Sequence, residues 1–274
     1  MIKYSSGDYI MYQFEWPKSD PIEQALRKVQ LFCEKYYPNG YTELDLETLI
    51  QLGYQTGQYS GLAAQFLEAS GASKILDLKY WQYYYDMLMN NFDFKSYIKT
   101  LEPGCGYLPC LGSMIVKDNP WIEITGMDPN IIESWSNEHG IIPKKEPIIY
   151  DESLFHFKET TPVHEYDFLI GIHPCDATIP MIRLALQNEK EMFLAVCDCN
   201  GLAGIINASY DDWVRYLVDL INAKLPRSMH VEIFLDYGYR GDNYKIDTIE
   251  TKRPVICIHK KRVYQIPKFL NNHN

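Results

Sequence analysis

The sequence predicts an α/β fold in which a mostly parallel sheet of seven strands carries helices on both faces. From residue 96 onward, strand-like and helix-like segments alternate, which is typical of parallel strands joined by crossover helices. The last two strand-like segments, 231–237 and 254–259, have no helical pattern between them, so we expect a hairpin and an antiparallel last strand. Residues 1–95 lack this alternation, and we expect them to form a helical subdomain beside a main domain of residues 96–274.

The composition is that of a folded protein with an acidic surface. Of the 274 residues, 46% are hydrophobic, which is enough for a normal core. The formal net charge of −10 disfavours binding along a nucleic-acid backbone, because such binding requires a basic surface. The short basic run at 260–262 is therefore interpreted as a solvated strand end.

The sequence also predicts a cytoplasmic protein that does not enter a membrane. No stretch approaches the roughly 18–20 consecutive apolar residues of a membrane helix. Residues 1–16 contain acidic side chains and no apolar run, unlike a secretion signal. The seven cysteines are an odd number, so we expect reduced thiols.

The first helix of the N-terminal part should begin at Asp20. Asp20 is a helix cap, Pro21 suits the first helical position, and Glu23 is an acid in the first turn. Further helices are expected over 42–52, 62–67 and 76–91, the last of which contains Tyr80, Tyr83, Tyr84 and Tyr85. These tyrosines either line a substrate pocket or pack between helices with their hydroxyls in water.

The main domain is expected to follow a regular order. Before the hairpin, strands are expected at 97–101, 122–127, 147–150, 168–172 and 192–197. Helices are expected at 111–118, 128–135, 179–187 and 213–223, the last one opened by a capping box at 209–212. Ligands of such sheets lie outside the carboxyl ends of the strands, at the point where the strand order reverses.

A glycine turn, Glu102-Pro103-Gly104-Cys105-Gly106, follows the first strand at that edge. Glycines let the backbone approach a ligand closely. A dinucleotide-binding turn would have a third glycine where this chain has Pro109, and an acid beside the turn disfavours a phosphate ligand. The carboxylate of Glu102 instead suits a ligand with an ammonium group.

With the acids that follow the next two strands, this turn resembles a class I S-adenosylmethionine-dependent methyltransferase, whose fold is Rossmann-like. The resemblance covers residues 96–261, and it departs from the family at Leu108, where a third glycine is frequent. It implies that Glu102, Gly104, Cys105 and Gly106 face the methionine part of S-adenosyl-L-methionine. Asp128 would bind both ribose hydroxyls, Met127 or Pro129 would pack on the adenine, and Asp151, with Glu152 or Ser153 beside it, would accept from the adenine amino group. For Asp128 alone, a helix cap is the other interpretation, and one carboxylate can serve both roles.

The loop after the fourth strand carries the candidate catalytic residues His173 and Asp176. His173 would lie near the sulfonium as a cofactor-binding residue and possible general base, whereas shaping the pocket or capping the next helix are alternative roles. Asp176 is also interpreted as a cap for that helix. The segment 171–178 is similar to a His-x-Cys loop in a methyltransferase group that includes a tRNA ribose methylase.

Cysteines at the ends of neighbouring strands could form a metal site with His173. Cys175, Cys197 and Cys199 are the candidates, but zinc usually binds a Cys-x-x-Cys pair, and Cys197 and Cys199 form Cys-x-Cys. Small buried residues at strand ends explain them without a metal, so we predict no metal site.

The resulting hypothesis is a cytoplasmic methyltransferase that uses S-adenosylmethionine, with a small-molecule acceptor favoured over nucleic acid. Two alternatives remain: an RNA methyltransferase of the tRNA type, and a noncatalytic regulatory protein that binds S-adenosylmethionine. A nicotinamide-dependent oxidoreductase is disfavoured by Glu102 and Pro109. The sequence leaves the oligomeric state open.

Overall fold

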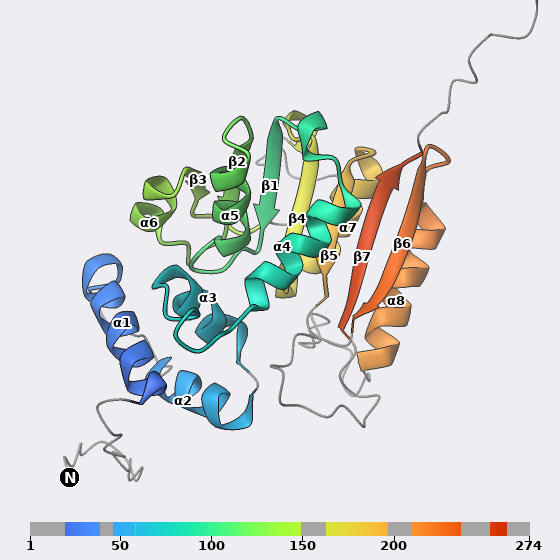
Figure 1. The fold of residues 1–274 in the computed structure, drawn as a ribbon. Coiled ribbons are helices and arrows are strands. Elements are labelled where there is room, and N and C mark those ends of the chain that lie inside the picture. The colour runs from blue at the N-terminus through green and yellow to red at the C-terminus, as the bar shows by residue number, and fades with distance from the viewer. Residues whose placement is uncertain are drawn as a thin grey trace, which may run out of the picture. The chain divides into compact units, whose positions relative to one another are not determined.

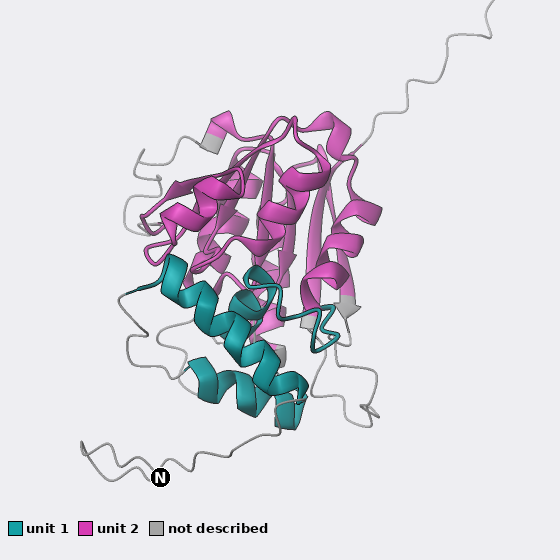
Figure 2. Ribbon diagram, turned by 60° about the vertical axis from the view of Figure 1, so that its left-hand side comes forward, with its two compact units in different colours: residues 1–79 teal, residues 80–274 magenta. Residues whose placement is uncertain are grey.

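The computed structural model describes residues 20–38, 46–57, 59–148, 163–196, 210–236 and 253–261. The chain divides into two compact units, residues 1–79 and residues 80–274, which Figure 2 colours teal and magenta. The functional boundary after residue 95 stays a prediction.

The described residues of the first unit form three helices, α1 (Pro21–Tyr36), α2 (Leu46–Thr56) and α3 (Gly61–Ala69). The predicted cap of α1 is confirmed, because the Asp20 carboxylate accepts a hydrogen bond from the Ile22 N–H at 2.9 Å. Edge-to-face packing of Phe32 against Phe66, with ring centroids 5.9 Å apart, joins α1 to α3.

The second unit is built on a seven-stranded sheet with the order β3-β2-β1-β4-β5-β7-β6 (Figure 1). Its strands are β1 (Lys99–Pro103), β2 (Glu123–Met127), β3 (Ile141–Lys144), β4 (Phe168–Ile172), β5 (Glu191–Ala195), β6 (Met229–Asp236) and β7 (Arg253–Lys260). β7 runs antiparallel to both of its neighbours, and the other pairings are parallel. This arrangement confirms the predicted Rossmann-like fold with its antiparallel last strand.

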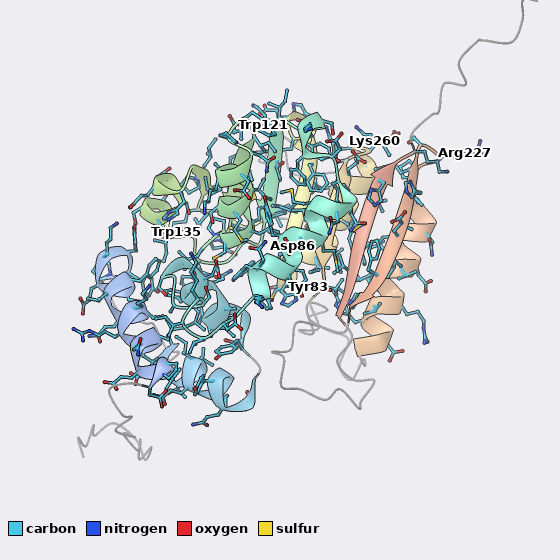
Figure 3. The ribbon with its side chains drawn as sticks, viewed as in Figure 1. Tyr83, Asp86, Trp121, Trp135, Arg227 and Lys260 are labelled. Carbon is cyan, nitrogen blue, oxygen red and sulfur yellow. The ribbon has the colours of Figure 1, made fainter. Side chains whose placement is uncertain are left out.

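Helices cover both faces of the sheet. The helices of this unit are α4 (Tyr80–Asn91), α5 (Cys110–Asp118), α6 (Glu133–Glu138), α7 (Thr178–Gln187) and α8 (Tyr210–Lys224). α4 and α5 lie on one face and α7 and α8 on the other (Figure 1). Figure 3 marks Trp135 on α6, which is buried and stacks on His139 with ring centroids 4.1 Å apart.

Alternation along the strands divides the core into two layers. Leu169 of β4 and Ile256 of β7 belong to the buried cluster that also contains Met181 of α7 and Trp213 of α8. On the opposite face, Phe168 packs against Phe92, Phe94 and Tyr97, which lie in the segment between α4 and β1. The sheet is therefore buried on both faces around β1 and β4, as its apolar strands require.

The prediction for the third strand was wrong. The third strand lies at Ile141–Lys144, ahead of the predicted 147–150, and its Pro143 pairs with Gly126 of β2. Residues 147–148 are in no strand, and 149–150 lie outside the described residues. Proline lacks an N–H and is tolerated mainly at sheet edges, where one side of the strand makes no ladder bonds. β3 is such an edge strand, so a proline is compatible with its place in the sheet.

The helix predicted to start at Asp128 was also placed wrongly. The α6 helix begins at Glu133, and its cap position is Ile132. The Asp128 side chain accepts a hydrogen bond from the Asn130 N–H at 2.8 Å, and the Asp128 carbonyl accepts one from Ile131 at 3.2 Å. Both bonds favour a local turn in place of a helix at 128–131.

Among the described residues, no helix is both long enough and apolar enough to cross a bilayer.

A glycine inside α5 allows that helix to lie close to the sheet. A Cβ at Gly112 would come 2.5 Å from Glu102 Oε2 and 3.2 Å from side-chain atoms of Ile124 and Ile141. In a dinucleotide-binding turn, the third glycine allows this close packing of helix and strand. Gly112 has the same role here. Leu108 is buried in the turn before the helix.

We expect Gly112→Ala to destabilise the protein by about 1–3 kcal/mol through overpacking, although alanine is the better helix former. The measurement is urea-induced unfolding followed by circular dichroism. Gly61→Ala in α3 is the matched control, because a Cβ there meets nothing within 4 Å, and it should be neutral or stabilising. Equal stability of Gly112→Ala and wild type would contradict the close packing.

Candidate cofactor and active site

The order of the strands reverses between β1 and β4. From β1 the chain continues outward to β2 and β3, whereas β4 lies on the other side of β1 and continues to β5. The loops after β1 and β4 therefore meet at the carboxyl edge of the sheet, which is the ligand-binding position in folds of this type. A Cβ at Gly104 would lie 2.7 Å from the Pro174 carbonyl oxygen, so these two loops are in direct contact.

The turn after β1 has the backbone conformation that its glycines permit. Gly104 has φ of 65° and Gly106 has φ of 70°, both in the left-handed region. The Gly104 N–H donates to the Met127 carbonyl at 2.8 Å, which continues the β1–β2 ladder into the turn. The turn is thus anchored to the end of β2 by its backbone.

Asp128 fixes the same turn through its side chain. One carboxylate oxygen, Oδ2, accepts from the Gly106 N–H at 3.0 Å, and the other, Oδ1, accepts from the Asn130 N–H at 2.8 Å. The Asp128 N–H donates to the Lys144 carbonyl at 3.1 Å. The carboxylate is partly exposed and each of its oxygens has two lone pairs, so it has capacity for further donors.

Glu102 is a buried acid under the glycine turn, and its side chain is 2% exposed. Its Oε2 accepts a hydrogen bond from the Gly112 N–H of α5 at 3.2 Å. Burial raises the pKa of Glu102 to about 8, and the Gly112 hydrogen bond only partly opposes this effect. A positively charged group placed beside the carboxyl would favour its ionised form.

The remaining predicted neighbours of the cofactor differ in accessibility. Cys105 is buried, its sulfur would lie 3.3 Å from a Cβ at Gly126, and burial raises the pKa of its thiol well above the usual value. Met127 is fully buried in the core, whereas Pro129 is exposed. Of the two residues proposed to pack on an adenine, Pro129 is therefore the accessible one.

The loop after β4 is held in an unusual conformation. His173 has φ of 51° and Cys175 has φ of 46°, and non-glycine residues rarely adopt this region. The His173 N–H donates to the Ala195 carbonyl at 2.9 Å, and the Ala177 N–H donates to the Pro174 carbonyl at 2.8 Å. Such strain is concentrated at functional sites, where the surrounding structure maintains it.

Two tyrosines of α4 hold the His173 ring. The Tyr80 hydroxyl lies 3.0 Å from Nδ1, and the Tyr84 hydroxyl lies 3.3 Å from Nε2. A neutral imidazole has one donor and one acceptor nitrogen, so one tyrosine donates to the ring and the other accepts from it. Tyr84 is buried and Tyr80 is half-buried, which makes Tyr80 the more accessible end of this chain of hydrogen bonds.

These contacts revise the interpretation of the tyrosines. Besides Tyr80 and Tyr84, the Tyr85 hydroxyl donates to Asp118 Oδ2 at 2.6 Å. Three tyrosine hydroxyls of α4 are therefore hydrogen-bonded to protein side chains and do not simply point into water. The sequence did not link the tyrosines to His173, and their spacing of four residues on one helix face was the only available signal.

The capping role predicted for Asp176 was wrong. A 3₁₀ turn, Cys175–Ala177, precedes α7, and the cap position is Ala177, with no side-chain hydrogen bond to the helix end. Asp176 is exposed in that turn, and a catalytic role for it stays a prediction. The exposed Cys175 thiol donates to the His173 carbonyl at 3.4 Å.

Several predicted residues lie outside the part of the chain that the structure describes, namely Asp151, Glu152, Ser153, Cys197 and Cys199. The corrected position of β3 introduces another acid that sequence reasoning missed. Glu146 follows the end of β3 by two residues, and it is half-buried. The paired Ile141 and Ile142 were the signal that could have located the strand.

Comparisons with known proteins give similarity at the level of the fold. No protein-family model and no curated protein sequence matches the chain. Among solved structures, the O-methyltransferase TomG from Streptomyces achromogenes, in complex with SAM, has a TM-score of 0.45 and 9% identity and covers 79% of this chain and 99% of its own. An O-methyltransferase from Bacillus cereus in complex with SAH has a TM-score of 0.38 and 11% identity and covers 88% of this chain and 100% of its own.

A third structure, a putative O-methyltransferase from Klebsiella pneumoniae, has a TM-score of 0.42 and 7% identity and covers 89% of this chain and 91% of its own. At these scores the likeness carries no argument by itself, and the strand order and directions are the stronger observation. The order and directions of the strands are those of the Rossmann-like sheet that the sequence predicts.

Glu102 should make stability depend on pH. Because its pKa is about 8 in the folded chain and near 4.5 ordinarily, the folded state retains a proton that the unfolded chain loses between these values. The stabilising contribution is fully present below about pH 4.5, falls as the pH rises towards 8, and is lost above that value. Glu102→Gln cannot ionise, so its free energy of unfolding should exceed that of wild type increasingly from pH 5 to pH 8.

Urea unfolding at pH 5, 7 and 9 measures this difference, which we expect to reach several kcal/mol. Glu123→Gln is the control, because Glu123 lies on the neighbouring strand but is exposed and pairs with Lys99 only at the surface. A pH-independent difference between Glu102→Gln and wild type would show that the carboxyl ionises normally.

Proposed function

We propose that this protein is an S-adenosylmethionine-dependent methyltransferase. The observation that carries the proposal is the placement of two carboxyl groups, Glu102 and Asp128, around one glycine turn at the switch point of the sheet. The Glu102 carboxyl is buried beneath the turn, and the Asp128 carboxylate accepts a hydrogen bond from the turn's backbone. A ligand with an ammonium group and a ribose suits this combination, and S-adenosylmethionine has both.

The same geometry disfavours a dinucleotide. Pyrophosphate sites use free N–H groups of the glycine turn and of the helix that follows. Here the Gly106 N–H already donates to a carboxylate, and the Gly112 N–H donates to another. Neither donor is therefore free for a phosphate, and the negative charge of Asp128 would repel one, which supports a cationic ligand.

Different residues of the chain would bind different parts of the ligand. Glu102 would hold the ammonium end, and its proton would leave as the positive charge arrives. Asp128 would accept from the ribose hydroxyls with the lone pairs that Gly106 and Asn130 do not use, and Pro129 would cover the adenine. Glu146, as well as the predicted Asp151 and Glu152, is a candidate for the adenine amino group.

His173 and Tyr80 would form the acceptor side of the site. S-adenosylmethionine supplies a methyl group on a positively charged sulfur, and the sulfur keeps the bonding electron pair when the methyl group moves. The chain then has to align the acceptor and remove its proton. In our proposal, Tyr80 takes the acceptor's proton as it donates its own to Nδ1 of His173, and Tyr84 accepts the hydrogen bond from Nε2.

A small molecule with a hydroxyl group is the acceptor that we propose. A hydroxyl loses its proton on methylation, which would require the base that His173 provides. The phenol rings of Tyr80 and Tyr84, 5.3 Å apart and nearly perpendicular, would offer an apolar surface beside that base. The net charge of −10 supports a small molecule over a long nucleic acid.

Asp128→Asn should weaken binding of S-adenosylmethionine about 10- to 100-fold. The amide keeps the shape of the side chain, but it loses the charge and replaces one acceptor oxygen by a donor, which leaves ribose or backbone donors unsatisfied. Isothermal titration calorimetry with S-adenosylmethionine and with its demethylated product measures the effect. The exposed Glu133→Gln on α6 is the control and should bind like wild type.

Thermal unfolding of Asp128→Asn, followed by circular dichroism, establishes that the variant is folded. Absence of heat with either ligand in folded wild-type protein would overturn the proposed cofactor. Unchanged affinity in Asp128→Asn would place the ribose elsewhere.

His173→Asn should reduce methyl transfer at least about 100-fold while leaving S-adenosylmethionine affinity within a factor of about two, because general-base catalysis typically contributes this much. Asparagine tolerates the left-handed conformation of residue 173, so the backbone is preserved. Transfer of a labelled methyl group to a panel of small hydroxyl compounds, with bulk tRNA in parallel, provides the assay. Tyr83→Phe on the same helix is the control.

Wild-type protein that binds the cofactor but labels nothing in the panel or in a cell extract would indicate a regulatory protein without catalysis. Labelled tRNA, without any labelled small molecule, would overturn the proposed acceptor. Equal rates of methyl transfer in wild type and His173→Asn would show that His173 does not act as the base.

A further inference from the structure

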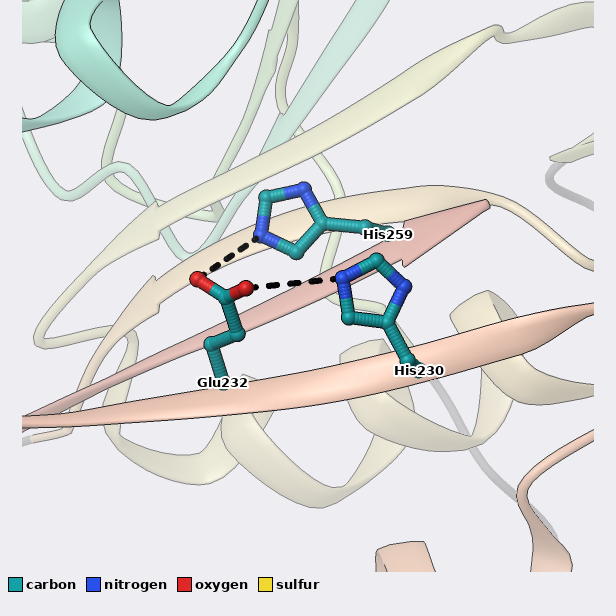
Figure 4. A group of neighbouring side chains, drawn as sticks. All are labelled: His230, Glu232 and His259. Atoms are coloured by element: carbon teal, nitrogen blue, oxygen red, sulfur yellow. Dashed lines mark ion pairs between the residues drawn. The ribbon is translucent and has the colours of Figure 1, made fainter. Parts of the chain in front are cut away.

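Three metal-binding side chains meet on the β6–β7 pair. His230 and His259 are direct partners in the antiparallel register, and Glu232 lies two residues beyond His230 on the same face of β6. Among the described residues, this group brings one ligand atom from each side chain within 4.8 Å of the others. Figure 4 shows both imidazole rings turned towards the carboxylate.

The distances suit a shared cation. His230 Nε2 lies 3.5 Å from Glu232 Oε1, and His259 Nε2 lies 3.9 Å from Glu232 Oε2. Around a tetrahedral zinc ion with ligand bonds of about 2.0–2.2 Å, ligand atoms are separated by roughly 3.3–3.6 Å. The three ligand atoms lie within 4.8 Å of one another, so the side chains would have to bring them closer by up to about 1.3 Å to place all three on one ion.

The histidines are arranged by their stacking. The two imidazole rings are 5.0 Å apart with an angle of 20°, and Phe92 stacks on the other side of His259 at 4.4 Å. This stack limits the orientations of His259, whose side chain is 12% exposed, while His230 and Glu232 are each more than 40% exposed. One ligand is thus rigid and nearly buried, and the other two are open to an arriving ion.

The charge of the group also suits a divalent ion. Two neutral imidazoles and one carboxylate have a charge of −1, and the imidazole nitrogens favour zinc over magnesium or calcium, which prefer oxygen ligands. Directly opposite Glu232 lies the buried Cys257. Lys260, labelled with Arg227 in Figure 3, is on the next position of β7, where side chains alternate to the other face.

We propose that His230, Glu232 and His259 bind a zinc ion that joins β6 to β7. The fourth position would be filled by water. The site lies at the amino end of β6, and β6 runs parallel to β1, so it is at the edge of the sheet opposite to the glycine turn. The ion would therefore stabilise the strand pair and would not take part in the chemistry at His173.

Isothermal titration calorimetry of the metal-free full chain with zinc chloride tests the site. We expect one equivalent to bind with micromolar affinity and magnesium chloride to produce no binding. His230→Ala and Glu232→Gln should each weaken zinc binding at least tenfold, and because both side chains are exposed, the fold should survive. His164→Ala is the control, since His164 is exposed outside the group and should leave the affinity unchanged.

A second measurement separates this site from adventitious binding. Zinc should raise the melting temperature of wild type and of His164→Ala, but not that of His230→Ala or Glu232→Gln, and it should leave S-adenosylmethionine affinity unchanged. No zinc binding below about 1 mM in wild type would overturn the proposal. Equal zinc affinity in wild type, His230→Ala and Glu232→Gln would overturn it as well, because the ion would then be bound elsewhere.

Discussion

One hydrogen bond, from the Gly106 N–H to the Asp128 carboxylate, connects the turns after β1 and β2. The turn around Gly104 depends on it, because the same loop must leave β1, reverse its backbone and begin α5 within a few residues. Asp128 also closes its own turn through Asn130 and delays the start of α6. This side chain therefore contributes hydrogen bonds to the turns after both β1 and β2, at the carboxyl edge of the sheet. The proposed contact with the ribose would therefore use a residue, Asp128, that the fold already requires.

Glu102 imposes the complementary constraint from below the turn. Its carboxyl occupies the space that any side chain at residue 112 would need, so the tight approach of α5 and the burial of an acid are a single arrangement. A buried carboxylate without a cation is costly, and the protein meets that cost by holding the group protonated near neutral pH. A cationic ligand would reverse this preference, which ties the protonation of Glu102 to occupancy of the site.

The features that local sequence determines were predicted well. The strand at 168–172 has the observed bounds, and the first and second strands differ by only one or two residues, because apolar and β-branched residues between turn residues indicate them. The meeting of Glu102, Gly104, Gly106 and Asp128 followed from the parallel topology. Contacts between distant segments were not predictable: the tyrosines of α4 at His173 and the histidines of β6 and β7 depend on register and packing. β3 was missed because Pro143 resembles a loop residue when the edge position is unknown.

The position of β7 has a consequence for synthesis of the chain. β7 is the last of the described strands along the chain, yet it pairs between β5 and β6. On the ribosome, β5 therefore has an unpaired edge and β6 has no described partner strand until residues 253–260 emerge. Unpaired strand edges invite association with other chains. The sheet is thus completed only when β7 emerges, and the interval before that event is when the nascent protein most depends on protection from aggregation.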